Sequence, residues 1–175
     1  MGEDKAFLKY GNRFLYEYTL SILKKFSGNI LISSINQRFN QHDYLCIKDE
    51  IPNLGPIGGI YSCLKKIKCE SAIVLPCDLP LISENVLKIL LKNSPGYDIT
   101  VALNPQNYPE PLIGVYSTSV IPVLKKMIDS QHYKLQEALC LVNTNFVKIP
   151  GSSPEIFRNI NNPEEFNTLP GEKSI

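Results

Sequence analysis

A single carboxylate, Asp78, is the first candidate for chemistry, because it follows directly on an apolar run. The run, residues 71–75, is short and nearly uninterrupted, which is typical of a strand covered on both faces. Such a strand would place Asp78 at the carboxyl end of a sheet. Pro76 and Pro80 would limit the conformational freedom of the backbone on either side. A carboxylate there suits a hard cation such as Mg²⁺, which prefers carboxylate and phosphate oxygens. An aspartate that caps its own turn is the alternative, and position alone leaves both open.

A glycine-rich segment, residues 55–59 with the sequence GPIGG, is the second candidate. It follows Asp49, and it lies in a Pro- and Gly-rich stretch, 50–59, that we expect to be a loop. Residues 60–67 would continue as a helix. Glycines let a backbone approach a ligand closely, and a helix N-terminus offers free N–H groups to an anion. The same residues could also form nothing more than a tight turn.

Two weaker candidates lie near the ends of the chain. Lys5 precedes the first predicted helix and could offer a point charge to a phosphate, although a solvated surface lysine is the ordinary interpretation. Asn159 and Asn161 could bind the polar edge of a ligand. An Asx-type helix start before Pro163 is the alternative, and from these residues alone we favour it.

Strands and helices alternate along most of the chain, which predicts an α/β fold with a mainly parallel sheet and helices on both faces. In such sheets, ligands bind at the carboxyl ends of the strands. A short last helix should start at Pro163. The hydrophobic periodicity predicts helices at 12–26, 60–67, 83–92, 119–128 and 133–141, and strands at 29–33, 44–47, 71–75, 99–103, 112–116 and 145–149.

Length and composition exclude several classes of protein. The chain has 175 residues, which suits one domain, expected at 1–168, followed by a frayed tail at 169–175. Its net charge of +1 gives no electrostatic case for nucleic acid or an anionic membrane surface. No apolar run is long enough to span a membrane, and no signal peptide is evident, so we expect a cytoplasmic location. The five cysteines form no CxxC pair, which favours reduced thiols.

The chain resembles the MobA-type molybdenum cofactor guanylyltransferases in the order of five motifs: DKA, GPIGGI, PCDLP, EPLIGVY and NINNPEEF. The resemblance extends from about residue 1 to residue 166. It implies a Rossmann-like, three-layer α/β/α nucleotidyltransferase that transfers GMP from GTP to molybdopterin with Mg²⁺ and releases pyrophosphate. Other molybdenum cofactor biosynthesis proteins or molybdoenzyme chaperones would be its partners. A molybdopterin cytidylyltransferase, or another nucleotidyltransferase of the same fold, is the alternative within this resemblance.

The resemblance also assigns residues to roles. Asp78 would hold Mg²⁺ and the triphosphate, and Lys5 would contact the nucleotide phosphates, so these two residues are the catalytic candidates. The nucleotide would be bound by Lys5, Asp49, Gly55, Pro56, Gly58 and Asp78. Pro111, Leu112, Asn159 and Asn161 would lie on the molybdopterin side.

One departure from the family pattern concerns the beginning of the chain. The family starts with a strand and a loop close to LxGGxSxRMG, and Met1 and Gly2 match only the last two positions of that loop. We therefore expect the sheet to lack its first, central strand. The chain would then be either a shortened form of an active enzyme or a degenerate homologue that binds molybdopterin or a partner without catalysis.

Overall fold

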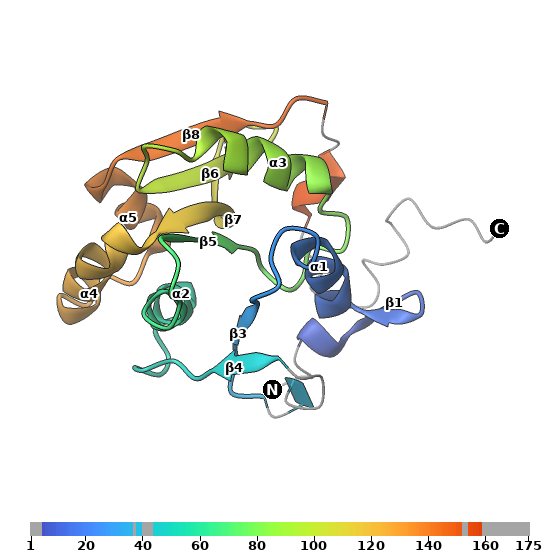
Figure 1. Ribbon diagram of the computed structural model, residues 1–175, viewed down its shortest axis with the longest axis horizontal. Helices are drawn as coiled ribbons and strands as arrows, with labels where there is room; N and C mark the ends of the chain where they lie inside the picture. The colour runs from blue at the N-terminus through green and yellow to red at the C-terminus, as the bar shows by residue number, and fades with distance from the viewer. Residues whose placement is uncertain (1–4, 37, 40–43, 152–153, 159–175) are drawn as a thin grey trace.

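A four-stranded sheet forms the larger part of the fold in the computed structural model (Figure 1). Its strands lie in the order β5 (Ser71–Val74), β7 (Pro109–Ser117), β6 (Ile99–Leu103) and β8 (Thr144–Lys148). β7 is antiparallel to both β5 and β6, whereas β8 is parallel to β6. β5, β6 and β8 therefore share one direction. The structure describes residues 5–36, 38–39, 44–151 and 154–158.

The described residues also form two separate pairs of strands. β3 (Leu31–Ser33) and β4 (Leu45–Ile47) form a parallel pair, and β1 (Lys9–Tyr10) and β2 (Arg13–Phe14) form an antiparallel ribbon. Figure 1 shows β4, β3, β5, β7, β6 and β8 following one another up the view, with a break between β3 and β5. Among the described residues, no ladder of hydrogen bonds joins β3 to β5.

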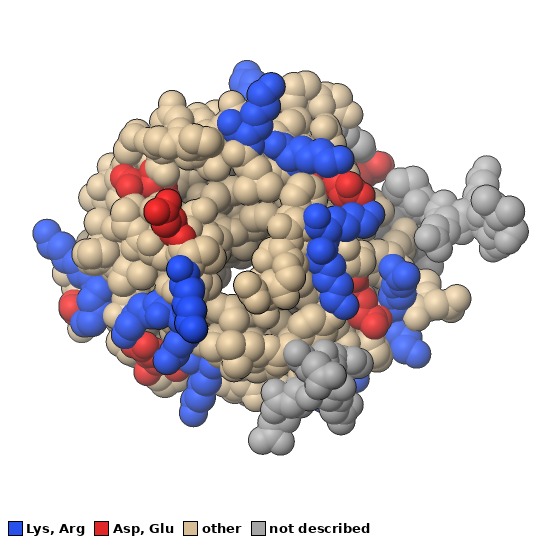
Figure 2. All heavy atoms as spheres, viewed as in Figure 1, with Lys and Arg blue, Asp and Glu red and all other residues tan. Residues whose placement is uncertain are grey.

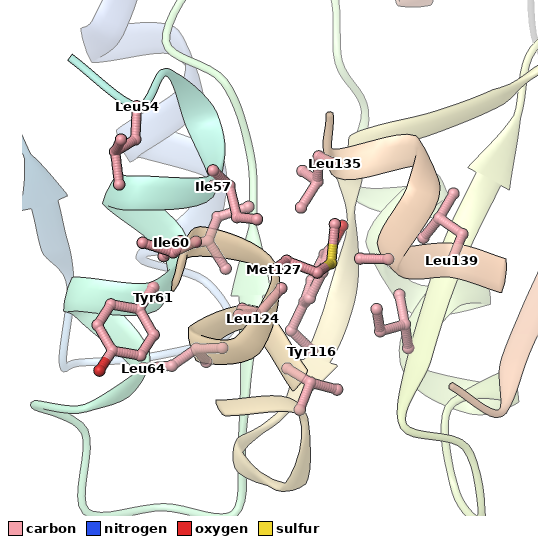
Figure 3. Close-up of a cluster of buried hydrophobic side chains, with 14 of the residues drawn as sticks. Leu54, Ile57, Ile60, Tyr61, Leu64, Tyr116, Leu124, Met127, Leu135 and Leu139 are labelled. Carbon is pink, nitrogen blue, oxygen red and sulfur yellow. The ribbon is translucent and has the colours of Figure 1, made fainter. Parts of the chain in front are cut away.

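Helices cover both faces of this arrangement, so the fold has three layers. Side chains of α2, α4 and α5 share one buried cluster with the sheet, part of which Figure 3 shows. Side chains of α3 and α1 share a second cluster on the opposite face. The helices are α1 (Leu15–Leu23), α2 (Pro56–Leu64), α3 (Glu84–Asn93), α4 (Ile121–Asp129) and α5 (Leu135–Leu141), with short 3₁₀ helices at Lys5–Phe7, Thr118–Val120 and Pro154–Phe157.

The side chains of β6 explain why this strand is central to the core. Ile99 and Val101 belong to the α2, α4 and α5 cluster, and Ala102 belongs to the α3 cluster. All three side chains are fully buried. Successive side chains of a strand point to opposite faces, so one strand supplies both halves of the core.

Several element boundaries differ from the sequence predictions. The expected 50–59 loop ends at Gly55, because Pro56 already occupies the first position of α2, where its missing N–H does little harm. The expected helix at 12–26 starts only at Leu15, because β2 pairs with β1 before it. The antiparallel β7 departs from the expected parallel pattern, since a short turn after β6 can connect only antiparallel neighbours. The helix expected after Pro163 lies outside the described residues.

Candidate nucleotide and acceptor site

Asp78 lies in the turn directly after β5, where its side chain is half-buried. Leu79, the next residue, is almost completely buried and anchors this turn in the core. The hydroxyl of Thr19, on α1, donates a hydrogen bond to the carbonyl oxygen of Pro76 at 3.2 Å. The carboxylate is therefore held at the carboxyl end of β5, as the sequence predicts.

Burial raises the pKa of Asp78 above its ordinary value. A backbone hydrogen bond and the charge of Lys5 act in the opposite direction, but they do not cancel the effect of burial. The influence of Lys5 means that the two catalytic candidates lie within electrostatic reach of each other, although Lys5 itself is exposed. A cation bound at Asp78 would favour the ionised carboxylate that burial disfavours.

Asp49 lies after β4, and its carboxylate accepts a hydrogen bond from the neighbouring strand, β3. The Ser33 hydroxyl, at the end of β3, donates a hydrogen bond to Asp49 Oδ1 at 2.8 Å. A Cβ atom on Gly58 would lie 3.2 Å from Asp49 Oδ2, and one on Gly59 would overlap with Ser33 Oγ. Burial, followed by the charge of Asp49, raises the pKa of the Cys63 thiol to about 11. The two helical glycines thus let α2 pack directly against the Ser33–Asp49 pair.

A cavity of about 300 Å³ opens beside the Asp78 turn. Of the predicted site residues, Pro56, Pro111 and Leu112 line it together. The buried hydroxyl of Tyr116 fixes this wall by donating a hydrogen bond to the Pro111 carbonyl oxygen at 2.6 Å. The complete lining is Pro56, Pro76, Leu79, Glu110, Pro111, Leu112, Ile113, Tyr133, Lys134, Leu135 and Gln136.

Lys134 is a further candidate, which nothing in the sequence singles out. We expected the helix to begin at residue 133, but α5 begins at Leu135, so Lys134 is the residue that precedes its first turn. There the exposed lysine contributes a positive charge to the cavity wall. The only sequence signal was a lysine near a predicted helix start, which is as ordinary as the signal for Lys5.

The predicted site residues divide into two groups around the first turn of α2. Pro56, Pro111 and Leu112 line the cavity, and Leu79, the neighbour of Asp78, lines it with them. The second group is made of Asp49 and Gly58, which lie against each other. Gly55 is exposed between the two groups, and its φ of 67° is a conformation that favours glycine. Asn159 and Asn161 lie outside the described residues.

The side chains present are compatible with a magnesium site that depends on substrate. In the part of the chain that the structure describes, no group of three or more His, Cys, Asp or Glu residues is assembled to hold a metal ion. Mg²⁺ commonly binds to one or two carboxylates together with substrate phosphates and waters, rather than in an all-protein cage. Asp78 can therefore serve as the protein ligand for an ion that arrives with a nucleotide.

The contact between Gly59 and Ser33 predicts a mutational coupling. Gly59→Ala should lower the stability by about 1–2 kcal/mol, because the new methyl group also lies only 3.0 Å from Ser33 Cβ. Ser33→Gly removes the group that the methyl would meet, so it should recover at least half of this loss. Thermal unfolding of both single variants and the double variant measures the coupling. Strictly additive effects would contradict it.

Comparison with known proteins shows the family to which the chain is similar. A family model described as "MobA-like NTP transferase domain" matches residues 1–142. A protein of Bacillus subtilis named "Probable molybdenum cofactor guanylyltransferase" is 30% identical over 174 residues, which cover 96% of this chain and 87% of that protein. A protein of the same name from Flavobacterium johnsoniae is 28% identical and covers 97% of this chain and 89% of its own length.

Solved structures show the same fold. Molybdopterin-guanine dinucleotide biosynthesis protein A from Archaeoglobus fulgidus superposes with a TM-score of 0.79 at 22% identity, over 95% of this chain and 89% of that one. The 2-C-methyl-D-erythritol 4-phosphate cytidylyltransferase from Thermus thermophilus superposes with a TM-score of 0.68 at 14% identity, over 94% and 91% of the two chains. The fold is therefore that of the nucleotidyltransferases. In the described ranges, no helix has the length and apolar character needed to cross a membrane.

Proposed function

The chain belongs to the MobA-like NTP transferase family, and from this premise we propose that it transfers the guanylyl group of GTP to molybdenum-bound molybdopterin. The observation that carries the proposal most directly is the cavity beside Asp78. It is lined by residues of the first turn of α2, of β7 and of the turn that follows β5. These elements are the ones to which the resemblance assigns nucleotide and acceptor binding.

In this reaction, a terminal phosphate oxygen of the acceptor attacks the α-phosphorus of GTP. The new bond joins that oxygen to the α-phosphorus, and the bond from the α-phosphorus to the pyrophosphate oxygen breaks. Phosphoryl chemistry of this kind depends on positioning and charge stabilisation more than on a protein nucleophile. Pro111 and Leu112 would position the acceptor, while Lys5 would hold the phosphates of the nucleotide.

Mg²⁺, when bound, would neutralise charge that develops on the phosphate oxygens. Asp78 would hold the ion. Asp49, fixed by Ser33 at 2.8 Å, would position the nucleotide rather than take part in bond making. The exposed backbone of Gly55 and Pro56, at the beginning of α2, would approach the nucleotide from the other side. We propose a cytoplasmic location, with molybdenum cofactor biosynthesis proteins or molybdoenzyme chaperones as partners.

Pyrophosphate release tests this function. The chain is incubated with GTP, Mg²⁺ and molybdenum-loaded molybdopterin, and the release of pyrophosphate is followed. Turnover with GTP and none with CTP would support guanylyl transfer. Turnover with CTP alone would replace it with cytidylyl transfer, and no turnover with either nucleotide would contradict the enzymatic proposal.

Lys134 should contribute to binding of the anionic acceptor. Lys134→Ala should raise the KM for molybdopterin about 5–20-fold with a smaller change in kcat, because the lysine lines the cavity at the acceptor side. Lys134→Arg keeps the positive charge and should recover most of the affinity. Lys148→Ala removes a lysine of β8 that does not line the cavity, and it serves as a matched control. An unchanged KM in Lys134→Ala would refute the role of this lysine.

A further inference from the structure

Two buried hydroxyl groups each hold one proline carbonyl at the cavity beside Asp78. The Thr19 hydroxyl, on α1, donates to the Pro76 carbonyl oxygen at 3.2 Å. The Tyr116 hydroxyl, on β7, donates to the Pro111 carbonyl oxygen at 2.6 Å. Both prolines line the cavity, whereas neither of the residues that carry the hydroxyls is part of its lining. The two hydroxyls therefore act on the cavity from behind its walls.

The wall formed by residues 111–113 lies outside the regular strand ladder. Val101 of β6 is opposite Gly114, but the next residue, Ala102, is opposite Glu110. This register shift leaves residues 111–113 without an opposite residue in β6. On the other side, the pairing of β7 with β5 reaches only to Gly114. Bulges of this kind redirect side chains, and they tolerate a proline because they need no ladder N–H.

The Tyr116 hydroxyl fixes the conformation of this bulge. Its side chain is fully buried in the cluster that contains Met127 and Leu135, and Figure 3 shows it beside Met127. Because the core holds the ring, the hydroxyl has a fixed place from which to bind the carbonyl of the buried Pro111. That bond orients the peptide plane between Pro111 and Leu112. The cavity wall thus takes its shape from a group in the core.

The Thr19 hydroxyl has the corresponding role at the opposite wall. Thr19 is only 4% exposed. A helical threonine commonly bonds to a carbonyl of its own preceding turn, but this hydroxyl reaches Pro76, which is distant in the sequence. The ladder of β5 ends at Val74, so Pro76 lies beyond it. The bond orients the peptide plane that leads to Asp78.

Both hydrogen bonds join neutral groups, so they fix the walls without changing their charge. Most of the cavity lining is uncharged, and Glu110 and Lys134 are its charged residues. Figure 2 shows charged side chains spread around the hollow near the middle of the view, which is bordered mainly by uncharged residues. Replacing either hydroxyl with an apolar group therefore changes the geometry of a wall while the charges around the cavity stay the same.

We propose that Thr19 and Tyr116 are positioning residues for different substrates. Thr19 sets the place of Asp78, and through it the place of the metal ion and the triphosphate. Tyr116 sets the place of the 111–113 bulge, and through it the place of the acceptor. This inference rests on the function proposed above. Loss of the two hydroxyls should therefore have different kinetic effects, whereas a general loosening of the fold would affect both substrates alike.

Tyr116→Phe tests the acceptor wall and keeps the buried ring. It should raise the KM for molybdopterin about 5–10-fold, with the KM for GTP and the Mg²⁺ requirement unchanged within about twofold. Tyr18→Phe is the matched control, because the Tyr18 hydroxyl also donates to a backbone carbonyl oxygen at 2.6 Å, that of Tyr10, which does not line the cavity. The control should leave the acceptor KM unchanged. Steady-state kinetics measures each constant.

Thr19→Val tests the Asp78 side and keeps the volume of the side chain. It should lower kcat about 5–10-fold and raise the Mg²⁺ concentration for half-maximal rate at least about threefold, with an unchanged acceptor KM. Thr19→Ser keeps the hydroxyl and should recover most of kcat. Thr100→Val is the matched control, because it removes a buried hydroxyl that has no hydrogen-bond partner among the described residues. It should leave kcat unchanged.

Three results would overturn the proposal: the same effect of Tyr116→Phe and Thr19→Val on both substrates, an unchanged acceptor KM in Tyr116→Phe, or no recovery in Thr19→Ser. Rates are compared well below the lowest Tm of the set, so that all proteins are folded. Each wall has its own variant, so a variant that fails to fold leaves the other to decide.

Direct binding separates this inference from the function on which it rests. Absence of turnover in the unsubstituted chain would overturn the proposed function. Calorimetric titration with molybdopterin and with Mg²⁺ and GTP would then decide the inference. Tyr116→Phe should bind molybdopterin about fivefold more weakly, and Thr19→Val should bind the nucleotide and metal about fivefold more weakly. Affinities equal to those of the unsubstituted chain would overturn the inference.

Discussion

Asp78→Ala should lower kcat/KM for guanylyl transfer by about 10²–10³-fold. This loss is expected because the substitution removes the carboxylate to which we assign the metal and the triphosphate, and single groups that stabilise developing charge contribute effects of this size. The turn itself is anchored by the buried Leu79 and by the bond from Thr19 to Pro76, so the surrounding backbone should keep its position. Steady-state kinetics with GTP and Mg²⁺ measures the effect.

A stability measurement separates this loss of activity from unfolding. Burial raises the pKa of Asp78, so the folded protein favours the neutral carboxyl, and ionising it at pH 7 costs stability. Asp78→Asn removes that cost and should raise the Tm at pH 7 by about 1–3 °C, a modest value because the group is partly solvated. Below the ordinary aspartate pKa, both states are protonated and the advantage should disappear.

For Asp78, activity and stability are therefore predicted to change in opposite directions when the carboxylate is removed. An inactive Asp78→Asn protein with an equal or higher Tm would support a role in binding the metal and the phosphates. Near-normal activity in Asp78→Ala would refute that role. A Tm that falls by more than about 5 °C in Asp78→Asn would instead show that the carboxylate is needed for the fold.

The sequence predicted the fold well where burial alone determines the structure. The strand expected at 99–103 is β6 without a change of boundary, because both faces of this strand are buried and its apolar run is continuous. The fold class also followed from the alternation of strands and helices. The antiparallel direction of β7 was missed because the alternation of strands and helices suggested parallel neighbours, whereas the short connection between β6 and β7 allows only an antiparallel pair.

The candidate site was predictable only in part, for a similar reason. The position of Asp78 was predictable because a residue that follows an apolar strand lies at the carboxyl end of the sheet, although β5 itself is only half-buried. The helical position of Gly58 and Gly59 was missed, because glycine favours loops unless a close neighbour requires the absence of a side chain. That neighbour is the Ser33–Asp49 pair, which comes from residues distant in the sequence. Lys134 was missed because only the folded chain brings it to the same cavity as Pro111.

Gly114→Ala should strongly destabilise the fold. A Cβ atom at this position would lie 2.6 Å from the carbonyl oxygen of Thr100 and 3.0 Å from a methyl group of Val101. The first of these is a backbone atom of β6, so a side-chain rotation cannot relieve the overlap. Overpacking of this kind costs about 2–4 kcal/mol, which corresponds to a fall in Tm of roughly 5–15 °C for a chain of this length.

The position of Gly114 in the sheet makes this overlap difficult to relieve. β7 lies between β5 and β6, and Gly114 is opposite Val74 in one ladder and Val101 in the other. Moving β7 away from β6 would strain the pairing with β5, and the register already shifts next to Val101. Gly28→Ala is the matched control, because its added methyl group would meet no atom within 4 Å, and it should change the stability by less than about 0.5 kcal/mol. Equal melting temperatures for the two variants would contradict this account, because close contact between β6 and β7 is the only difference on which it depends.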